Sequence, residues 1–181
     1  NIARRWTWYQ LPVLRGVTGD LSEADALKGT VDGLRRGVQR QLVADVPVGA
    51  FLSGGLDSSA VVAFARAQVP DIRCFTIESV GGQDAGATDD LPYAQRVAEY
   101  LKVPLDVVRI DASRMADDLE RMVVQLDEPL ADPAPLNLLY ISQLAREQGI
   151  KVLLSGAGGD DLFTGYRRHL AVNYERYWDY L

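Results

Sequence analysis

The feature that most constrains the fold is an apolar run that ends in glycines and then in polar residues able to begin a helix. Residues 48–52 are apolar, residues 53–55 read Ser-Gly-Gly, and residues 57–59 read Asp-Ser-Ser before a helical pattern of apolar residues. A buried strand, a tight turn and a helix are therefore predicted in immediate succession, which is the unit that α/β folds repeat.

The rest of the chain continues this alternation. Further strands are predicted over residues 73–77, 105–110 and 151–154, and further helices over residues 91–101, 113–126 and 136–147, with Gly149 ending the last helix. Strands that alternate with helices predict right-handed crossovers. We therefore expect an α/β fold with a doubly wound parallel sheet and helices on both faces, and ligands of such sheets bind beyond the carboxyl ends of the strands.

The chain divides into a short first segment and one domain. Residues 1–20, rich in aromatics and glycine, are interpreted as a linker from a missing N-terminal domain, and residues 21–181 as one α/β domain truncated at its C-terminus. Ser22, with Asp25 three residues later, predicts the start of an amphipathic helix that runs to about residue 45. Residues 78–90, rich in glycine and acids, are expected to form a loop.

The first glycine turn has the chemistry of an anion site. Glycines let the backbone bring N–H groups close to a phosphate, and the first N–H groups of a helix favour negative charge. The hydroxyls of Ser53, Ser58 and Ser59 add donors, while the carboxylate of Asp57 suits an anion that is accompanied by Mg²⁺. A metal-bound polyphosphate is the predicted ligand. The alternative is an ordinary turn in which Asp57 and Ser58 only cap the helix.

A second turn of the same kind follows the last predicted strand. Residues 155–166 read Ser-Gly-Ala-Gly-Gly-Asp-Asp-Leu-Phe-Thr-Gly-Tyr, so glycines again lead to acids. Asp57 and Asp160 are predicted to share one Mg²⁺ with phosphate oxygens. The alternative is a capped turn in which Asp160 and Asp161 complement the helix dipole.

Composition narrows the class of protein. The chain has 181 residues, a formal net charge of −6, one cysteine and one histidine. The acidity disfavours a nucleic-acid partner, and no apolar run approaches the roughly 20 residues of a membrane helix. Because Cys74 is the single cysteine, an internal disulfide is excluded, and the chain suits a reducing cytoplasm. Cys74 is expected to be a small buried hydrophobic side chain, and His169 is expected at a solvent-exposed position on a helix. The first residue is not Met, so a fragment is expected.

The two motifs together resemble a known family. Residues 53–58 are similar to the Ser-Gly-Gly-x-Asp-Ser pyrophosphate loop of the ATP pyrophosphatases, whose fold is called adenine nucleotide alpha hydrolase-like. The loop also has a doubled serine, and residues 155–166 are similar to the motif Ser-Gly-Glu-Gly-x-Asp-Glu-x-Phe-x-Gly-Tyr. On these two features the chain most resembles the synthetase domain of glutamine-hydrolysing asparagine synthetases. The resemblance covers roughly residues 40–170 and includes an acceptor-pocket segment at residues 127–133.

The resemblance implies an enzyme that adenylates a carboxylate with ATP and Mg²⁺ and then forms an amide with ammonia supplied by a glutaminase domain. It implies asparagine synthesis from aspartate in the cytoplasm, a small-molecule substrate, and neither nucleic acid nor membrane as a partner. Carried over residue by residue, Asp57 and Asp160 are the metal ligands, and the nucleotide is bound by Leu52, Ser53, Gly54, Gly55, Asp57, Ser58, Ser59, Ile77, Ser155 and Gly156. No catalytic residue is identified.

The chain also departs from the family pattern. Ala157 stands where the asparagine enzymes have a glutamate that is thought to assist proton removal, and Asp161 replaces the following glutamate. A lysine that the family uses near the α-phosphate would lie beyond Leu181. Amidation of a different carboxylate, a nucleotide-binding module without amide synthesis and a tRNA-modifying enzyme therefore stay open as alternatives.

Overall fold

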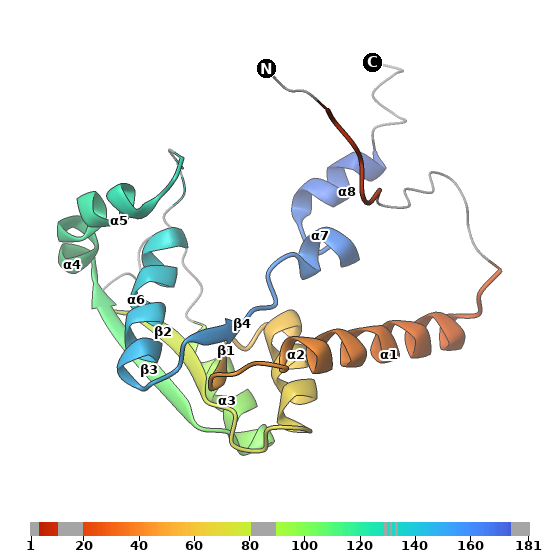
Figure 1. The fold of residues 1–181 in the computed structure, drawn as a ribbon, viewed down its shortest axis with the longest axis horizontal. Helices are drawn as coiled ribbons and strands as arrows, with labels where there is room; N and C mark the ends of the chain where they lie inside the picture. The colour runs from red at the N-terminus through yellow and green to blue at the C-terminus, as the bar shows by residue number, and fades with distance from the viewer. Residues whose placement is uncertain are drawn as a thin grey trace.

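The centre of the molecule is a parallel sheet with the strand order β3-β2-β1-β4 (Figure 1). The computed structural model describes residues 4–10, 20–80, 90–128, 130, 132 and 134–174. Its strands are β1 (Val48–Phe51), β2 (Cys74–Val80), β3 (Leu105–Asp111) and β4 (Val152–Leu154). All neighbouring pairs run parallel, as the alternation of strands and helices predicts.

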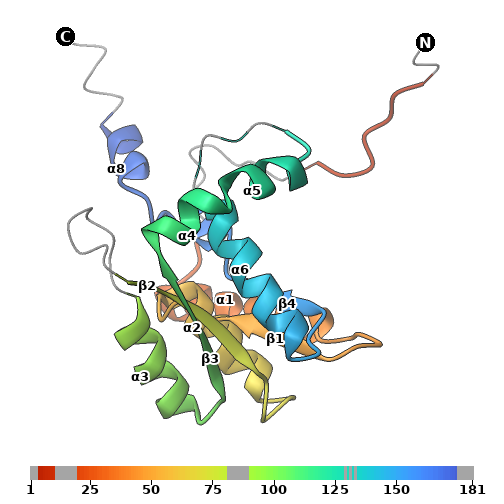
Figure 2. The ribbon, with the colours of Figure 1, turned by 90° about the vertical axis from the view of Figure 1, so that its left-hand side faces the viewer.

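Helices cover both faces of this sheet (Figure 2). One layer holds α2 (Leu56–Arg66) and α3 (Leu91–Leu101), with α1 (Glu23–Gln41) packed on α2. The opposite layer holds α6 (Ala134–Glu147), with α4 (Ala112–Asp117) and α5 (Leu119–Gln125) beside it. After β4 come α7 (Gly159–Phe163) and α8 (Arg167–Asn173), which extend away from the sheet (Figure 1). The doubly wound α/β class is therefore confirmed.

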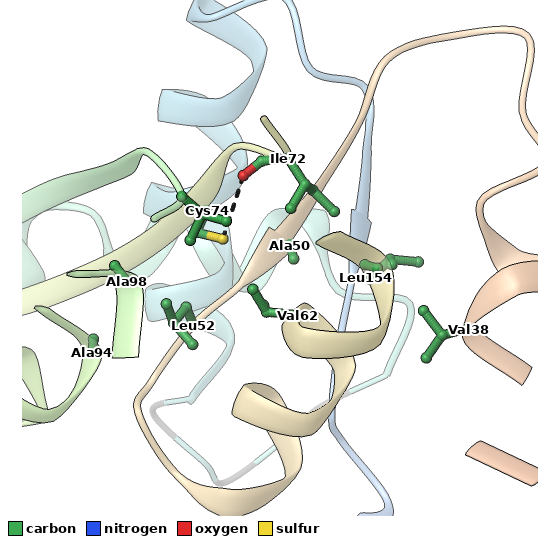
Figure 3. Close-up of a cluster of buried hydrophobic side chains, with 11 residues drawn as sticks. Val38, Ala50, Leu52, Val62, Ile72, Cys74, Ala94, Ala98 and Leu154 are labelled. Atoms are coloured by element: carbon green, nitrogen blue, oxygen red, sulfur yellow. Dashed lines mark hydrogen bonds between the residues drawn. The ribbon is translucent and has the colours of Figure 1, made fainter. Parts of the chain in front are cut away.

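Successive side chains along each strand point to opposite faces of the sheet, so the core is divided between the two helix layers. Ala50 and Cys74 pack with Val62 of α2 on one face, as Figure 3 shows, while Phe75 packs with Ile141 of α6 on the other. Cys74 is fully buried, and this burial raises the pKa of its thiol to about 12. The thiol therefore behaves as a small buried hydrophobe rather than as a reactive nucleophile.

The observed elements differ from the predicted ones mainly at their ends. β2 continues to Val80 because it pairs with β3 along its whole length, so the predicted loop begins later, and residues 81–89 lie outside the described residues. The helix predicted over residues 113–126 is divided at Asp118 into α4 and α5. The first helix begins after its predicted cap, where Ser22 Oγ accepts a hydrogen bond from the Asp25 amide, but it ends at Gln41.

The N-terminal segment is described only in part. Trp6 and Trp8 are largely exposed, and residues 11–19 lie outside the described residues, so the linker and its boundary at residue 20 stay predictions. Within the described ranges, no helix is both long and apolar enough to span a membrane.

Candidate functional site

The first glycine turn connects β1 to α2 at the carboxyl edge of the sheet. Gly54 adopts a φ of +79°, and a Cβ atom at this position would lie 2.5 Å from the amide nitrogen of Ala94 in α3. A residue with a side chain would therefore be strained in its backbone and would also collide with α3. Close packing against α3 is the reason that this turn needs glycine.

Hydrogen bonds of the Ser53 and Ser58 hydroxyl groups stabilise the first turn. Ser58 Oγ accepts a hydrogen bond from the Ser53 amide at 3.3 Å and donates one to the Gly55 carbonyl oxygen at 3.2 Å. The two serine hydroxyls lie 3.0 Å apart, and the Gly55 amide donates to Ser53 Oγ at 3.3 Å. These hydrogen bonds connect the start of the turn to the first residues of α2 and define its shape.

The second glycine turn follows β4 and packs directly on the first. Leu154 at the end of β4 pairs with Ala50 of β1, so both strands deliver their turns to the same edge of the sheet. A Cβ atom at Gly156 would lie 2.8 Å from the Ser58 amide nitrogen, and the carboxylate of Asp57 occupies the space beside Gly159. The glycines of the second turn therefore allow its backbone to approach the start of α2.

One cavity of about 420 Å³ lies between the two turns. Asp57 and Asp160, both half-buried, line it together, so the structure brings the two predicted metal ligands to one site. The predicted nucleotide contacts that line it are Ser53, Gly55, Asp57, Ser58, Ser155 and Gly156.

The remaining predicted contacts lie around the cavity rather than in its wall. Leu52 is buried in the core beside α2, Gly54 packs against α3, and Ile77 packs toward α6. Ser59 Oγ is buried and has no hydrogen-bond partner within the described part of the chain. A role for these four residues in binding a nucleotide stays a prediction.

Sequence reasoning missed several residues of the cavity wall. These are Phe51, Leu56, Gly159, Phe163 and Gly165, and the wall also includes Ala157, which the sequence singled out as a departure from the family pattern. Gly165 is required because the Asp160 carboxylate lies where its Cβ would be. Most of these residues stand within the two motifs, between residues that were already singled out. A motif does not show, however, which of its side chains line the same cavity.

The chemistry of the two aspartates fits Mg²⁺. This ion prefers oxygen ligands and is usually held by one or two carboxylates together with substrate phosphates and water. In the described ranges, no group of three or more acidic, histidine or cysteine side chains is arranged to hold a metal ion. Asp57 and Asp160 would therefore share the ion with oxygens that a phosphate ligand brings.

Two other predicted features lie outside this cavity wall. In the expected acceptor segment, Pro129, Ala131 and Pro133 are outside the described residues, and Asp132 accepts a hydrogen bond from the Ala134 amide at the start of α6. His169 is half-buried, and its Nδ1 accepts a hydrogen bond from the Tyr166 amide at the start of α8. The contact gives His169 a local structural role.

Two solved structures have a similar fold. The chain superposes on an NH₃-dependent NAD synthetase from Campylobacter jejuni with a TM-score of 0.50 and 13% identity, over 77% of this chain and 60% of that one. It superposes on the U34-tRNA thiolase NcsA from Methanococcus maripaludis with a TM-score of 0.51 and 18% identity, over 83% of this chain and 54% of that one. At these identities the likeness shows only the fold, that of the adenine nucleotide alpha hydrolase-like proteins.

Curated relatives are more similar in sequence. Asparagine synthetase 1 from Bacillus subtilis is 36% identical over 80% of this chain and 22% of its own length. The amidase chyE from Penicillium rubens is 33% identical over 80% of this chain and 23% of its own length. The chain thus spans about a quarter of these relatives. The family profile described as asparagine synthase matches residues 30–181, well over half of the chain. The chain therefore belongs to the asparagine synthase family.

Proposed function

We propose that the cavity between the two glycine turns binds Mg²⁺-ATP and that the protein is a ligase that forms a carbon–nitrogen bond. The observation that carries this proposal is the meeting of Asp57 and Asp160 in one cavity, each in the first turn of a helix that follows a separate strand. Membership of the asparagine synthase family supports it, because that family's name describes amide formation.

The residues have distinct proposed roles. The turn of Ser53 and Gly55 and the first N–H groups of α2 bind the β- and γ-phosphates, because these N–H groups have no partner within the helix. Asp57 and Asp160 hold Mg²⁺, which neutralises phosphate charge when it is bound. Ser155 and Gly156, which line the cavity from the second turn, contact the nucleoside in this proposal. The two turns thereby orient the α-phosphorus toward an attacking carboxylate and stabilise the charge that develops there.

Aspartate is the proposed acceptor and ammonia released from glutamine the proposed nitrogen donor. The aspartate carboxylate would attack the α-phosphorus, pyrophosphate would leave, and ammonia would then displace AMP to give asparagine. Similarity to asparagine synthetase 1 of Bacillus subtilis supports this acceptor. A reducing cytoplasm is the proposed location, in keeping with the single buried cysteine.

Amidation of a different carboxylate is the second candidate. Ala157 lines the cavity with a short side chain that cannot transfer a proton, and Phe51, Leu56 and Phe163 give the wall an apolar part. Such a wall would accommodate an acceptor larger and less polar than aspartate. The named amidase among the relatives shows that similar chains carry names other than asparagine synthetase.

The experiment that tests the proposal is ATP–pyrophosphate exchange by the full-length protein with Mg²⁺ and a series of carboxylic acids. Exchange that depends on aspartate supports the first candidate, and exchange with another acid alone supports the second. If ATP binds but no acid supports exchange, the protein is a nucleotide-binding module and the ligase proposal is wrong.

A further inference from the structure

We propose that Gly165 is a positioning residue for Asp160. Because Gly165 has no side chain, the Asp160 carboxylate can lie against it, and this contact holds the carboxylate at the cavity that both residues line. The inference rests on the proposed function, in which Asp160 binds Mg²⁺. Gly165 is not among the residues that the motifs predicted to contact the nucleotide or the metal, and the role assigned to it needs no contact with substrate.

Glycine is required at position 165 for space and not for its backbone conformation. Gly165 is not among the described glycines with a positive φ, so its φ is one that residues with side chains also adopt. The three atoms that a Cβ atom at Gly165 would meet first all belong to Asp160, and two of them, Oδ1 and Cγ, are in its carboxyl group. The side chain of Asp160 therefore excludes a larger residue from this position.

The end of α7 brings Gly165 back to Asp160. The Gly165 amide donates a hydrogen bond to the Asp160 carbonyl oxygen at 3.0 Å, and Thr164, just before it, has a left-handed φ of +65°. This conformation is unfavourable for a β-branched residue, and it reverses the direction of the chain where a helix ends. The backbone and the side chain of Asp160 thus both contact Gly165 across a single turn.

The next residue in the sequence, Asp161, lacks this arrangement. Its carboxylate is not part of the cavity wall and lies 2.8 Å from the Arg168 guanidinium, with both side chains largely exposed. Asp160 is half-buried and lies between the cavity and Gly165. Of the two consecutive aspartates, Gly165 therefore holds the one that faces the cavity.

A carboxylate held in one orientation favours binding of Mg²⁺. This ion demands near-ideal octahedral geometry, and residues that support a metal ligand commonly change metal affinity by about 10- to 100-fold. With alanine at position 165, the Cβ atom would overlap the Asp160 carboxylate, so the carboxylate would have to rotate or the turn would have to open. Either change moves one metal ligand and is expected to weaken metal binding more than nucleotide binding.

Binding of ATP with and without metal tests this role. Its affinity is measured by calorimetry in the full-length protein, once with Mg²⁺ and once with EDTA. Gly165→Ala is expected to weaken binding about tenfold with Mg²⁺ but less than twofold with EDTA. The control is Gly149→Ala after α6, where φ is +78° and the space around a Cβ is open, and it should change neither affinity. Unchanged binding with Mg²⁺, or an equal loss under both conditions, would overturn the inference.

Hydrogen exchange without ligand tests the contact between Gly165 and Asp160. Gly165→Ala is expected to speed amide exchange about tenfold in peptides covering residues 159–166 of the full-length protein. In the Asp160→Ala background the space is free, so the same change should alter exchange less than twofold. An equal effect in the two backgrounds, or no effect in either, would overturn the inference.

The two experiments separate the inference from the proposed function. If the wild-type protein binds no ATP, the proposed function fails, and the exchange experiment alone decides whether Gly165 positions Asp160. Should Gly165→Ala fold poorly, normal folding of the double variant with Asp160→Ala supports the inference. Poor folding of that double variant would overturn it, because the overlap with the carboxylate would then not be the cause.

Discussion

The two turns that form the cavity are similar in sequence but differ in how firmly they are held. The first leads into α2, which spans 11 residues and buries Ser58, Val62 and Ala65. The second leads into α7, which spans 5 residues and buries none. The first turn is also closed by its own serine network, whereas in the second the Ala157 amide donates to Ser155 Oγ.

This difference suggests a division of work between the turns. A turn anchored in the core can keep N–H groups aimed at a phosphate before the ligand arrives, which is what electrostatic preorganisation requires. A turn on a short exposed helix can move by small amounts as substrates enter and leave. Substitutions in each turn can test whether the two turns differ in this way.

The largest expected effect comes from the two aspartates. Asp57→Asn is expected to lower ATP–pyrophosphate exchange about a thousandfold, since the amide keeps the shape of the side chain but loses the charge that holds Mg²⁺. Asp160→Asn, in the looser turn, is expected to lose about a hundredfold because water can replace its oxygen more easily. Asp161→Asn is the control and should stay within about twofold. Exchange by Asp57→Asn at a rate near that of the wild type would remove this residue from the site.

Labelling of Cys74, which is buried in the sheet beneath the first turn, can measure how readily this part of the sheet opens. Burial raises the pKa of this thiol to about 12, so only one molecule in ~10,000 carries the thiolate at pH 8, against one in ~10 for a thiol with a pKa near 9. Labelling by a disulfide reagent is therefore expected to be about a thousandfold slower in the native protein than in denaturant. The rate should rise about tenfold with each pH unit and level off only as the pH approaches 12. Rapid labelling at pH 8 without denaturant would show that this part of the sheet opens readily.

Alanine at one glycine of each turn compares the packing of the turns. Gly54 and Gly158 both have positive φ, +79° and +89°, but a Cβ atom would meet the backbone of α3 at Gly54 and open space at Gly158. Gly158→Ala is expected to cost about 1 kcal/mol for the backbone conformation alone. Gly54→Ala should cost about 3 kcal/mol, because overpacking adds to it. Urea unfolding measures both values, and equal costs would contradict the difference in packing.

The smallest expected effect concerns the ion pair that connects α7 to α8. Arg168 lies 2.8 Å from Asp161 and over the ring of Tyr166, but both charged groups are largely exposed. Arg168→Ala is therefore expected to lower the free energy of unfolding by less than about 0.5 kcal/mol. Thermal unfolding at low and high salt checks this value. A loss above about 2 kcal/mol would mean that the second turn is held more firmly than its exposure indicates.

Much of the fold could be predicted because its signals are local. The apolar runs of β1 and β4 and the ends of α3 agree closely with the pattern. The division of α4 from α5 at Asp118 was missed, since it depends on distant contacts. The Tyr140 hydroxyl of α6 donates to the Arg114 carbonyl in α4, while Met122 of α5 packs in the same cluster as Tyr140. No pattern within residues 113–126 contains that information.

The candidate site shows the same limit. Glycines followed by aspartates indicated phosphate chemistry at both turns, and both predicted metal ligands do line one cavity. The motif did not show that Ser58 Oγ points into its own loop, nor that Leu52 lies in the core. Both facts depend on how α2 packs on the sheet.

The sequence by itself determined the two strand–turn–helix units and led to the prediction of a site for an anion with a metal, because glycine backbone freedom and helix N–H groups act within a few residues. Only the tertiary structure decided that the two units form one site. β1 pairs with β4, which places Gly156 against the amide of Ser58 from far along the chain. Contacts between such distant segments depend on the packing of the whole sheet, which no local pattern specifies.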